Sequence, residues 1–131
     1  MIGLDTNVLV RYIMQDDPQQ SPKANRLIES LSADQPGYIP MVSVVELYWV
    51  LTSCYGLTRP QVGQALDLIL RSKQLVVERA DQVMRALRVF GQGQADLADC
   101  LIERAASGAG CTDTMTFDVG ASKHAGMKLL A

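Results

Sequence analysis

The first ten residues, MIGLDTNVLV (1–10), place a carboxylate inside an apolar run. Residues 1–5 are short and mostly apolar, which is typical of a first β-strand, and Asp5 stands at its carboxyl end. Residues 6–18 follow with apolar side chains at helical spacing, so a helix is expected directly after Asp5. Burying an unpaired carboxylate is costly. Asp5 is therefore expected to have a partner, either the start of that helix or a bound cation.

The alternation of strand and helix continues along the chain. The predicted strands cover 1–5, 36–41, 74–80, 111–118 and 127–131. The predicted helices cover 6–18, 21–32, 43–56, 58–72, 81–93 and 95–108. Strands separated by helices are typical of a mainly parallel central sheet, here of four to five strands, flanked by helices on both faces. The sequence therefore predicts an α/β fold in a single domain over residues 1–131.

Several predicted helices begin with capping residues. Ser43 and Glu46 have the spacing of a capping box, in which each side chain bonds the backbone of the other residue. Thr58 and Gln61 repeat that spacing. Asp81 is expected to be the N-cap of the helix over 81–93.

Composition limits the class of protein. Twelve basic and fourteen acidic residues give a net charge of −2, so overall charge does not indicate nucleic-acid binding. No run of about 18 apolar residues predicts a membrane span, and no basic leader predicts a signal peptide. The three cysteines, Cys54, Cys100 and Cys111, form no CxxC pair. They suggest reduced thiols and a cytoplasmic protein without a membrane partner.

Acidic side chains recur at one edge of the predicted sheet. In open α/β sheets the functional crevice lies beyond the carboxyl ends of the strands. Asp5 ends the first predicted strand and Asp118 ends the fourth. Glu46 lies in the first turn of the helix after the second strand. Asp96 and Asp99 share the first turn of the helix over 95–108, so we expect all these acids at one edge.

A cluster of carboxylates repels itself by roughly a few kcal/mol per pair at 4 to 6 Å. A divalent cation removes that cost, and oxygen ligands without histidine or cysteine indicate Mg²⁺ or Mn²⁺. Each acid also has a structural explanation that stays open. Glu46 closes the capping box and Asp96 caps its helix, while Asp99 complements the helix dipole. Asp118 is placed as a turn residue would be, and a capping residue can still bind a metal.

The chain resembles the PIN-domain ribonucleases and, among them, the VapC-type toxins of bacterial VapBC toxin–antitoxin systems. The resemblance rests on LDTNVLV (4–10), SVVELYWVL (43–51), ADLADCLIERA (95–105) and TFD (116–118), in this order. It implies a catalytic site made of Asp5, Glu46, Asp99 and Asp118. Asp96 matches a further acid close to the third one. The supporting residues that match are Thr6, Asn7 and Thr116.

The resemblance also implies the activity and the partners. It implies hydrolysis of RNA with Mg²⁺ or Mn²⁺, with Asp5 and Asp99 as the main metal ligands and Asp96 and Asp118 as further ligands. Glu46 and Asp118 would bind the metal through water or orient the nucleophile. It further implies growth inhibition, a VapB-like antitoxin, and a homodimer or a toxin–antitoxin hetero-oligomer.

Basic residues are the candidates for RNA contact. Between residues 59 and 88, six basic residues stand against three acidic ones. Arg85 and Arg88 fall in this stretch, and Arg11 could flank the same cleft, although each also fits a solvated helix face. Phosphate contacts of this kind are independent of sequence and sensitive to salt. Gly91 and Gly93 in GQGQ form only an incomplete phosphate-binding pattern.

Three aromatic residues, Tyr48, Trp49 and Tyr55, fall within two turns of the helix over 43–56. Core packing explains them, and so does an exposed groove for a partner helix from an antitoxin or a dimer mate. Two other functions remain open. One is a PIN nuclease that processes RNA without an antitoxin, and the other is a non-catalytic α/β module that binds a metal or a protein. Asp113 interrupts the predicted strand over 111–118 and is expected to be a peripheral acid.

Overall fold

The computed structural model describes residues 1–130. The chain divides into two compact units, Met1–Glu78 (unit 1) and Arg79–Ala131 (unit 2). We describe each unit by itself. Within residues 1–130, no helix combines the length and the apolar character that a membrane crossing requires.

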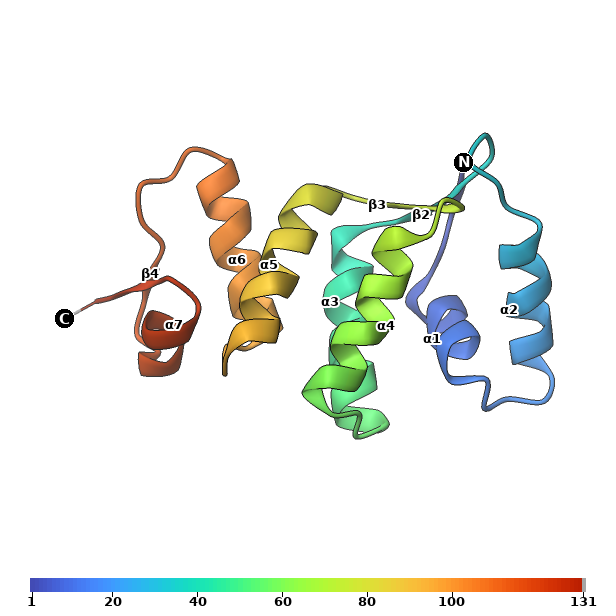
Figure 1. The fold of residues 1–131 in the computed structure, drawn as a ribbon, viewed down its shortest axis with the longest axis horizontal. Coiled ribbons are helices and arrows are strands. Elements are labelled where there is room, and N and C mark those ends of the chain that lie inside the picture. The colour runs from blue at the N-terminus through green and yellow to red at the C-terminus, as the bar shows by residue number, and fades with distance from the viewer. Residues whose placement is uncertain (131) are drawn as a thin grey trace. The chain divides into compact units, whose positions relative to one another are not determined.

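Unit 1 is built from a small parallel sheet and the helices that connect its strands (Figure 1). The strands are β1 (Ile2–Gly3), β2 (Gly37–Ile39) and β3 (Leu75–Val77), in the order β1-β2-β3. The helices are α1 (Thr6–Met14), α2 (Gln20–Glu29), α3 (Met41–Trp49) and α4 (Arg59–Arg71), with a π-helical turn η1 (Val50–Cys54) after α3. Each neighbouring pair of strands is parallel, as the helical connections require.

The core of unit 1 lies between this sheet and its helices. Its fully buried side chains are Leu9, Ile28, Ile39, Leu47, Leu51 and Val62. Gly37 lies in the middle strand, opposite Ile2 on one side and Leu75 on the other. A Cβ atom at Gly37 would come within 2.7 Å of Leu4 Cδ1 and 2.9 Å of Leu31 Cδ1. A larger residue at position 37 would therefore force the ends of these two leucine side chains to shift.

Unit 2 contains a helical hairpin followed by a small αβ element. The hairpin helices α5 (Ala80–Gln92) and α6 (Leu97–Gly108) lie side by side (Figure 1). The strands β4 (Met115–Thr116) and β5 (Lys128–Leu129) pair in parallel, and α7 (Val119–His124) connects them. The hairpin buries Val83, Ala86, Phe90, Leu97 and Cys100.

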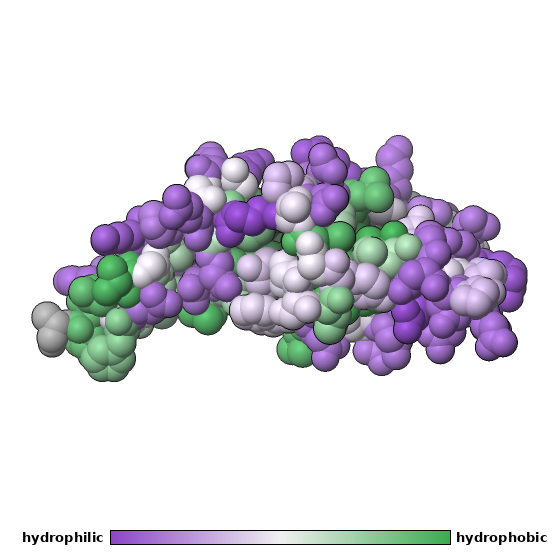
Figure 2. All heavy atoms as spheres, turned by 90° about the horizontal axis from the view of Figure 1, so that it is seen from below, coloured by the Kyte–Doolittle hydropathy of each residue, from purple (hydrophilic) through white to green (hydrophobic). Residues whose placement is uncertain are grey.

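Hydrophobic side chains are exposed on the last part of unit 2. Figure 2 shows them as green atoms near the C-terminal end of the chain. They are Met115, Phe117, Val119, Leu129 and Leu130, with exposed fractions between 44% and 81%. They lie in the two short strands, directly after them, or at the start of α7.

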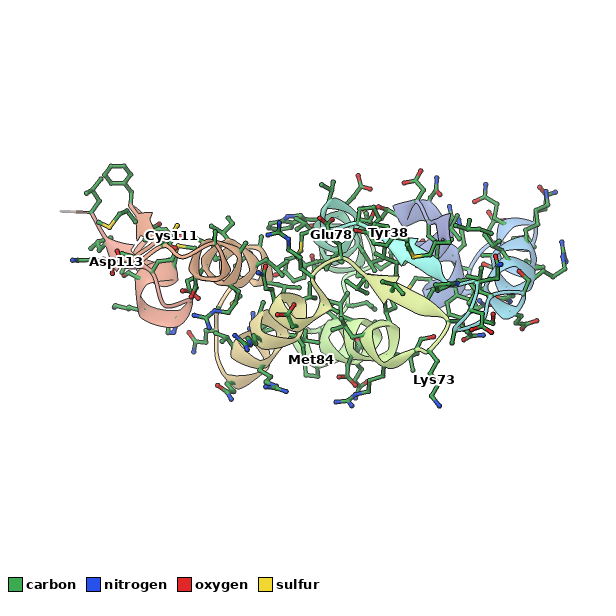
Figure 3. The ribbon with its side chains drawn as sticks, turned by 90° about the horizontal axis from the view of Figure 1, so that it is seen from above. Tyr38, Lys73, Glu78, Met84, Cys111 and Asp113 are labelled. Atoms are coloured by element: carbon green, nitrogen blue, oxygen red, sulfur yellow. The ribbon has the colours of Figure 1, made fainter. Side chains whose placement is uncertain are left out.

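The predicted α/β fold with parallel strands is confirmed. Each sheet has fewer strands than the four to five predicted, because the strands form a three-stranded sheet in unit 1 and a two-stranded sheet in unit 2. Each strand is also shorter than its apolar run. The run over 111–118 gives only Met115–Thr116, since Asp113 and Cys111 lie in the exposed segment before β4 (Figure 3). The single-domain interpretation stays a prediction.

The capping box at the start of α4 is confirmed. Thr58 Oγ1 accepts a hydrogen bond from the Gln61 N–H at 3.3 Å, and Gln61 Oε1 accepts one from the Thr58 N–H at 2.9 Å. The cap predicted for the next helix is wrong. Asp81 lies inside the first turn of α5, because the N-cap is Arg79, which has a left-handed φ of 50°.

The capping box predicted at Ser43 is also wrong. α3 begins at Met41, two residues earlier, with Pro40 as the N-cap. Proline has no side-chain acceptor, and the Met41 N–H instead donates to Glu78 Oε1 at 2.8 Å. Glu78 follows β3 and is marked in Figure 3. A carboxylate 37 residues along the chain therefore caps α3.

Candidate functional site

Asp5 lies just after β1 and is the N-cap of α1. Its Oδ1 accepts a hydrogen bond from the Thr6 N–H at 2.7 Å, and its carboxylate is exposed. The Leu4 N–H donates to the Tyr38 carbonyl at 2.9 Å, which ties the chain before Asp5 to the neighbouring strand. Within residues 1–130, Asp5 Oδ2 makes no hydrogen bond. Asp5 thus caps a helix, as one explanation predicted, and still has an oxygen free for a ligand.

The neighbours of Asp5 in the DTN motif have different environments. Thr6 is buried, with 5% of its surface exposed, and is the first residue of α1. Asn7 is exposed and lines a cavity of about 280 Å³ between α1 and α2. Arg11 and Lys23 line the same cavity.

Glu46 is exposed on α3 and does not cap the helix. Helix capping therefore does not explain Glu46, because α3 starts five residues before it. Glu46 borders an open groove of about 570 Å³ along one face of α3 and η1, which we call the α3 groove. The other residues that line the α3 groove are Met41, Val42, Val45, Trp49, Val50, Ser53 and Cys54. Glu46 is the one charged side chain in this lining.

Three predicted acids of unit 2 stand at the starts of two helices. Asp96 is the N-cap of α6, and its Oδ1 accepts a hydrogen bond from the Asp99 N–H at 3.2 Å. Asp118 is the N-cap of α7, and its Oδ1 accepts from the Gly120 N–H at 2.8 Å. Thr116 Oγ1 accepts from the Asp118 N–H at 3.0 Å, so Thr116 lies directly beside Asp118. The helix α7 itself was not predicted.

The carboxyl groups of these acids interact electrostatically. Partial burial raises the pKa of Asp99 above its usual value, and the charges of Asp96 and then Asp118 raise it further. Like charges disfavour ionisation of a carboxyl group only when they lie near it. In unit 2, Asp96 and Asp118 thus lie near enough to Asp99 to raise its pKa, and we call these three residues the unit 2 acid cluster.

The unit 2 acid cluster matches the chemistry of a hard cation. Its donors are carboxylate oxygens, without histidine or thiol, and Mg²⁺ and Mn²⁺ prefer such ligands. Among residues 1–130, neither unit alone holds three or more His, Cys, Asp or Glu side chains arranged to enclose a metal ion as they stand. The cluster is thus a set of repelling acids at helix starts, and a cation would relieve that repulsion.

Of the predicted RNA contacts, Arg11 is held by other side chains. Its Nη1 donates to Asp16 Oδ1 at 3.1 Å and to the Tyr55 hydroxyl at 3.2 Å. Its Nε donates to Gln20 Oε1 at 2.8 Å. Arg85 and Arg88, in contrast, are exposed on α5. The structure therefore separates the three arginines into one with protein partners and two at the surface.

The network around Arg11 is a feature that the sequence did not indicate. The Tyr55 hydroxyl donates to Asp16 Oδ2 at 2.7 Å. This hydrogen bond is the main cause of a lowered pKa of Asp16, and the bond from Arg11 adds to it. No local pattern in the sequence links Asp16 to a tyrosine 39 residues away. The network joins α1 to the end of η1.

Of the two neighbouring aromatic residues at the end of α3, one packs in the core and the other lies at an exposed groove. Tyr48 is buried and belongs to the core, while 47% of Trp49 is exposed. Their ring centroids lie 5.2 Å apart in an edge-to-face arrangement. Trp49 lines the α3 groove, so one aromatic packs inside and the next faces the surface.

Parallel strands joined by helices, with carboxylates at the helix starts, define an α/β protein with acidic side chains suited to a divalent cation. The sequence matches the PIN domain family over residues 2–127, nearly its whole length, and the chain belongs to this family. PIN domains are generally metal-dependent nucleases, which indicates the same broad class for this chain. No curated protein matches the sequence.

Proposed function

We propose that this chain is a Mg²⁺- or Mn²⁺-dependent endoribonuclease and the toxin of a type II toxin–antitoxin module. The observation that carries the nuclease proposal is the placement of Asp96, Asp99 and Asp118 at the starts of α6 and α7, in a chain of the PIN domain family. An acid cluster that binds no cation would only lower the stability of the fold. A cluster that holds a cation gains that energy back when the ion binds.

We assign roles to the acids by their chemistry. Asp5 and Asp99 are the main metal ligands, and Asp96 and Asp118 are further ligands. Glu46 orients the attacking water, since its carboxylate is exposed and caps no helix. A bound Mg²⁺ or Mn²⁺ would lower the pKa of a water molecule and stabilise negative charge on the leaving oxygen.

The backbone fixes these carboxylates by capping bonds. Each of Asp5, Asp96 and Asp118 accepts an N–H hydrogen bond at a helix start with one oxygen. A capping bond of this kind holds the side chain in one orientation and leaves the second oxygen available. Pre-oriented ligands lower the entropy cost of binding an ion.

The toxin role rests on the resemblance to VapC-type proteins and on the α3 groove. A VapB-like antitoxin would cover the catalytic acids, and an apolar helix or strand fits a groove lined by Trp49 and valines next to Glu46. The same surface could serve a second copy of the chain. A PIN nuclease of RNA processing shares the chemistry and lacks the antitoxin.

Cleavage of a labelled RNA tests the nuclease proposal. We expect cleavage with Mg²⁺ or Mn²⁺ that stops with EDTA and falls by at least about 100-fold in Asp5→Asn and in Asp99→Asn. Asp113→Asn is the matched control, since Asp113 is an exposed acid before β4, and its activity should equal that of the wild type. Cleavage that survives EDTA, or equal loss in all three variants, would refute the assigned site.

Growth of an expressing culture tests the toxin role. Expression of the wild type should arrest growth, Asp99→Asn should not, and a small open reading frame beside the gene should restore growth when it is co-expressed. A chain that cleaves RNA and leaves growth unchanged would be a processing nuclease.

A further inference from the structure

The helix α5 carries a polar stripe on one face. Asp81, Arg85, Arg88 and Gln92 follow one another at intervals of four, three and four residues, which places them on the same side of a helix. All four side chains are exposed. The buried residues of α5 are Val83, Ala86, Leu87 and Phe90. The stripe therefore lies on the solvent side, along the length of the helix.

The two arginines of the stripe have no partner in the protein. Within residues 1–130, neither Arg85 nor Arg88 forms a hydrogen bond or an ion pair. On α4, by comparison, an ion pair does form at this spacing: Arg71 Nε lies 2.9 Å from Asp67 Oδ2, four residues earlier. Asp81 has the same spacing from Arg85, yet no ion pair forms. Two guanidinium groups thus remain free to bind an external anion.

The stripe ends at the segment Gly91–Gln94, which we call the GQGQ turn. It contains the last two residues of α5 and the two residues that follow the helix. The backbone N–H groups of Gly93 and Gln94 make no hydrogen bond within residues 1–130. A Cβ atom at Gly91 or Gly93 would meet no atom within 4 Å, so the backbone here is open to a ligand. Bare amides beside a guanidinium group are a common setting for a phosphate.

The GQGQ turn leads directly into the unit 2 acid cluster. Asp96 follows Gln94 by two residues and caps α6, and Asp99 lies in the first turn of α6. Along α5, Arg88 precedes the end of the helix by four residues, or about 6 Å, and Arg85 by about 10 Å.

We propose that the stripe and the GQGQ turn bind the backbone phosphates of single-stranded RNA next to the cut site. The phosphates contact Arg85, Arg88 and the free amides, and the strand continues toward Asp96 and Asp99. This inference rests on the proposed function, because the substrate is RNA. The contacts are electrostatic, so they hold the strand without reading its bases.

We call the stripe and the GQGQ turn together the RNA track, and RNA binding without cleavage tests it. Anisotropy of a labelled single-stranded RNA of mixed sequence is measured in EDTA at several salt concentrations, with the wild type, Arg85→Gln, Arg88→Gln and the double variant. Each lost phosphate contact reduces the slope of log K against log salt by roughly 0.7 for a single strand. We expect the double variant to lose about 1.4 of the slope. Arg26→Gln is the control, because Arg26 is an exposed arginine of unit 1 without an ion pair.

The outcomes separate the track from the nuclease proposal. A reduced slope in the double variant, with Arg26→Gln like the wild type, supports the track whether or not the chain cleaves RNA. With Mg²⁺, the double variant should raise KM several-fold and leave kcat near the wild-type value. An unchanged slope in the double variant, an equal loss in Arg26→Gln, or a wild type that binds no RNA in EDTA would overturn the track.

Discussion

Asp99→Asn should raise the stability of the metal-free chain while it abolishes cleavage. In the folded state, partial burial and the charges of Asp96 and Asp118 raise the pKa of Asp99. Between the usual pKa and this raised value, the folded chain holds more protons than the unfolded chain. Stability therefore falls as the pH rises through that window and stays lowered at neutral pH. Asparagine keeps the shape and removes the charge.

Two effects oppose each other in this variant. A like-charged neighbour three or four residues away on a helix costs about 0.2–0.5 kcal/mol, and Asp96 lies three residues before Asp99. Asp118, at the start of α7, adds a further repulsion. An acid in the first turn of a helix gains about 0.3–1 kcal/mol from the dipole, which the variant loses. Partial burial of the charge adds to the repulsion, and we expect the two together to exceed the dipole contribution. Since Asp99 is partly exposed, we expect a net gain of about 0.5 kcal/mol, or a Tm higher by about 2 °C.

Thermal unfolding followed by circular dichroism measures this gain. Asp81→Asn is the matched control, because Asp81 lies in the first turn of α5, at the other end of the hairpin from the unit 2 acid cluster. It should lose only the dipole contribution, so its Tm should fall. Near pH 3 the Tm values of wild type and Asp99→Asn should converge, because Asp99 is then protonated.

The same unfolding experiment is repeated with Mg²⁺. At ten times the Kd for Mg²⁺, the wild type should gain about 1.4 kcal/mol, and Asp99→Asn should gain much less. The reasoning is refuted if metal-free Asp99→Asn melts below the wild type at neutral pH by as much as Asp81→Asn does. It is also refuted if both chains respond equally to Mg²⁺.

Three further predictions concern the fold around the site. Thr58→Ala removes the side-chain acceptor of the α4 capping box and should cost about 1 kcal/mol in urea unfolding; an unchanged midpoint would contradict that role. Gly37→Ala places a methyl group against Leu4 and should cost about 1–3 kcal/mol in the same assay, whereas a neutral result would mean that the leucine moves away freely. Tyr55→Phe removes the main cause of the low pKa of Asp16, so an NMR titration should show this pKa moving up toward its ordinary value; a pKa that stays low would assign the effect to Arg11. Stability that depends on the Asp16 carboxylate is lost as the pH falls through its pKa, and this loss should begin at a higher pH in the variant.

The sequence predicted features that depend on neighbouring residues. The Thr58–Gln61 box and the Asp96 cap each join groups three residues apart, so local spacing was sufficient to predict them. The placement of Asp5 after a strand and before a helix was predicted for the same reason. The family resemblance likewise follows short motifs in order along the chain.

Features that depend on distant residues were not predictable. The start of α3 is set by Glu78, which is remote in sequence, while Ser43 offered a local capping signal that the fold does not use. The Arg11–Asp16–Tyr55 network joins two segments through side chains alone. No periodicity marks such contacts before the chain has folded.

Short elements were the other source of error. The helix α7 has six residues with Gly120 in its first turn, so its apolar spacing is too brief to detect, and Asp118 fitted a turn equally well. The strands β1, β4 and β5 each have two residues, while their apolar runs are longer. Strand length depends on which backbone groups find a partner, and an apolar run does not show that.

The π-helical turn η1 has a consequence for insertions and deletions. In this turn the Tyr55 N–H bonds the Val50 carbonyl five residues back, at 3.3 Å, so η1 holds one residue more than an α-helical turn. Deleting one residue between 50 and 54 would restore α-helical geometry and rotate the following chain by about 100°. The Tyr55 hydroxyl would then no longer reach Asp16. A homologue that is one residue shorter in this turn should therefore also lack the tyrosine or its acidic partner.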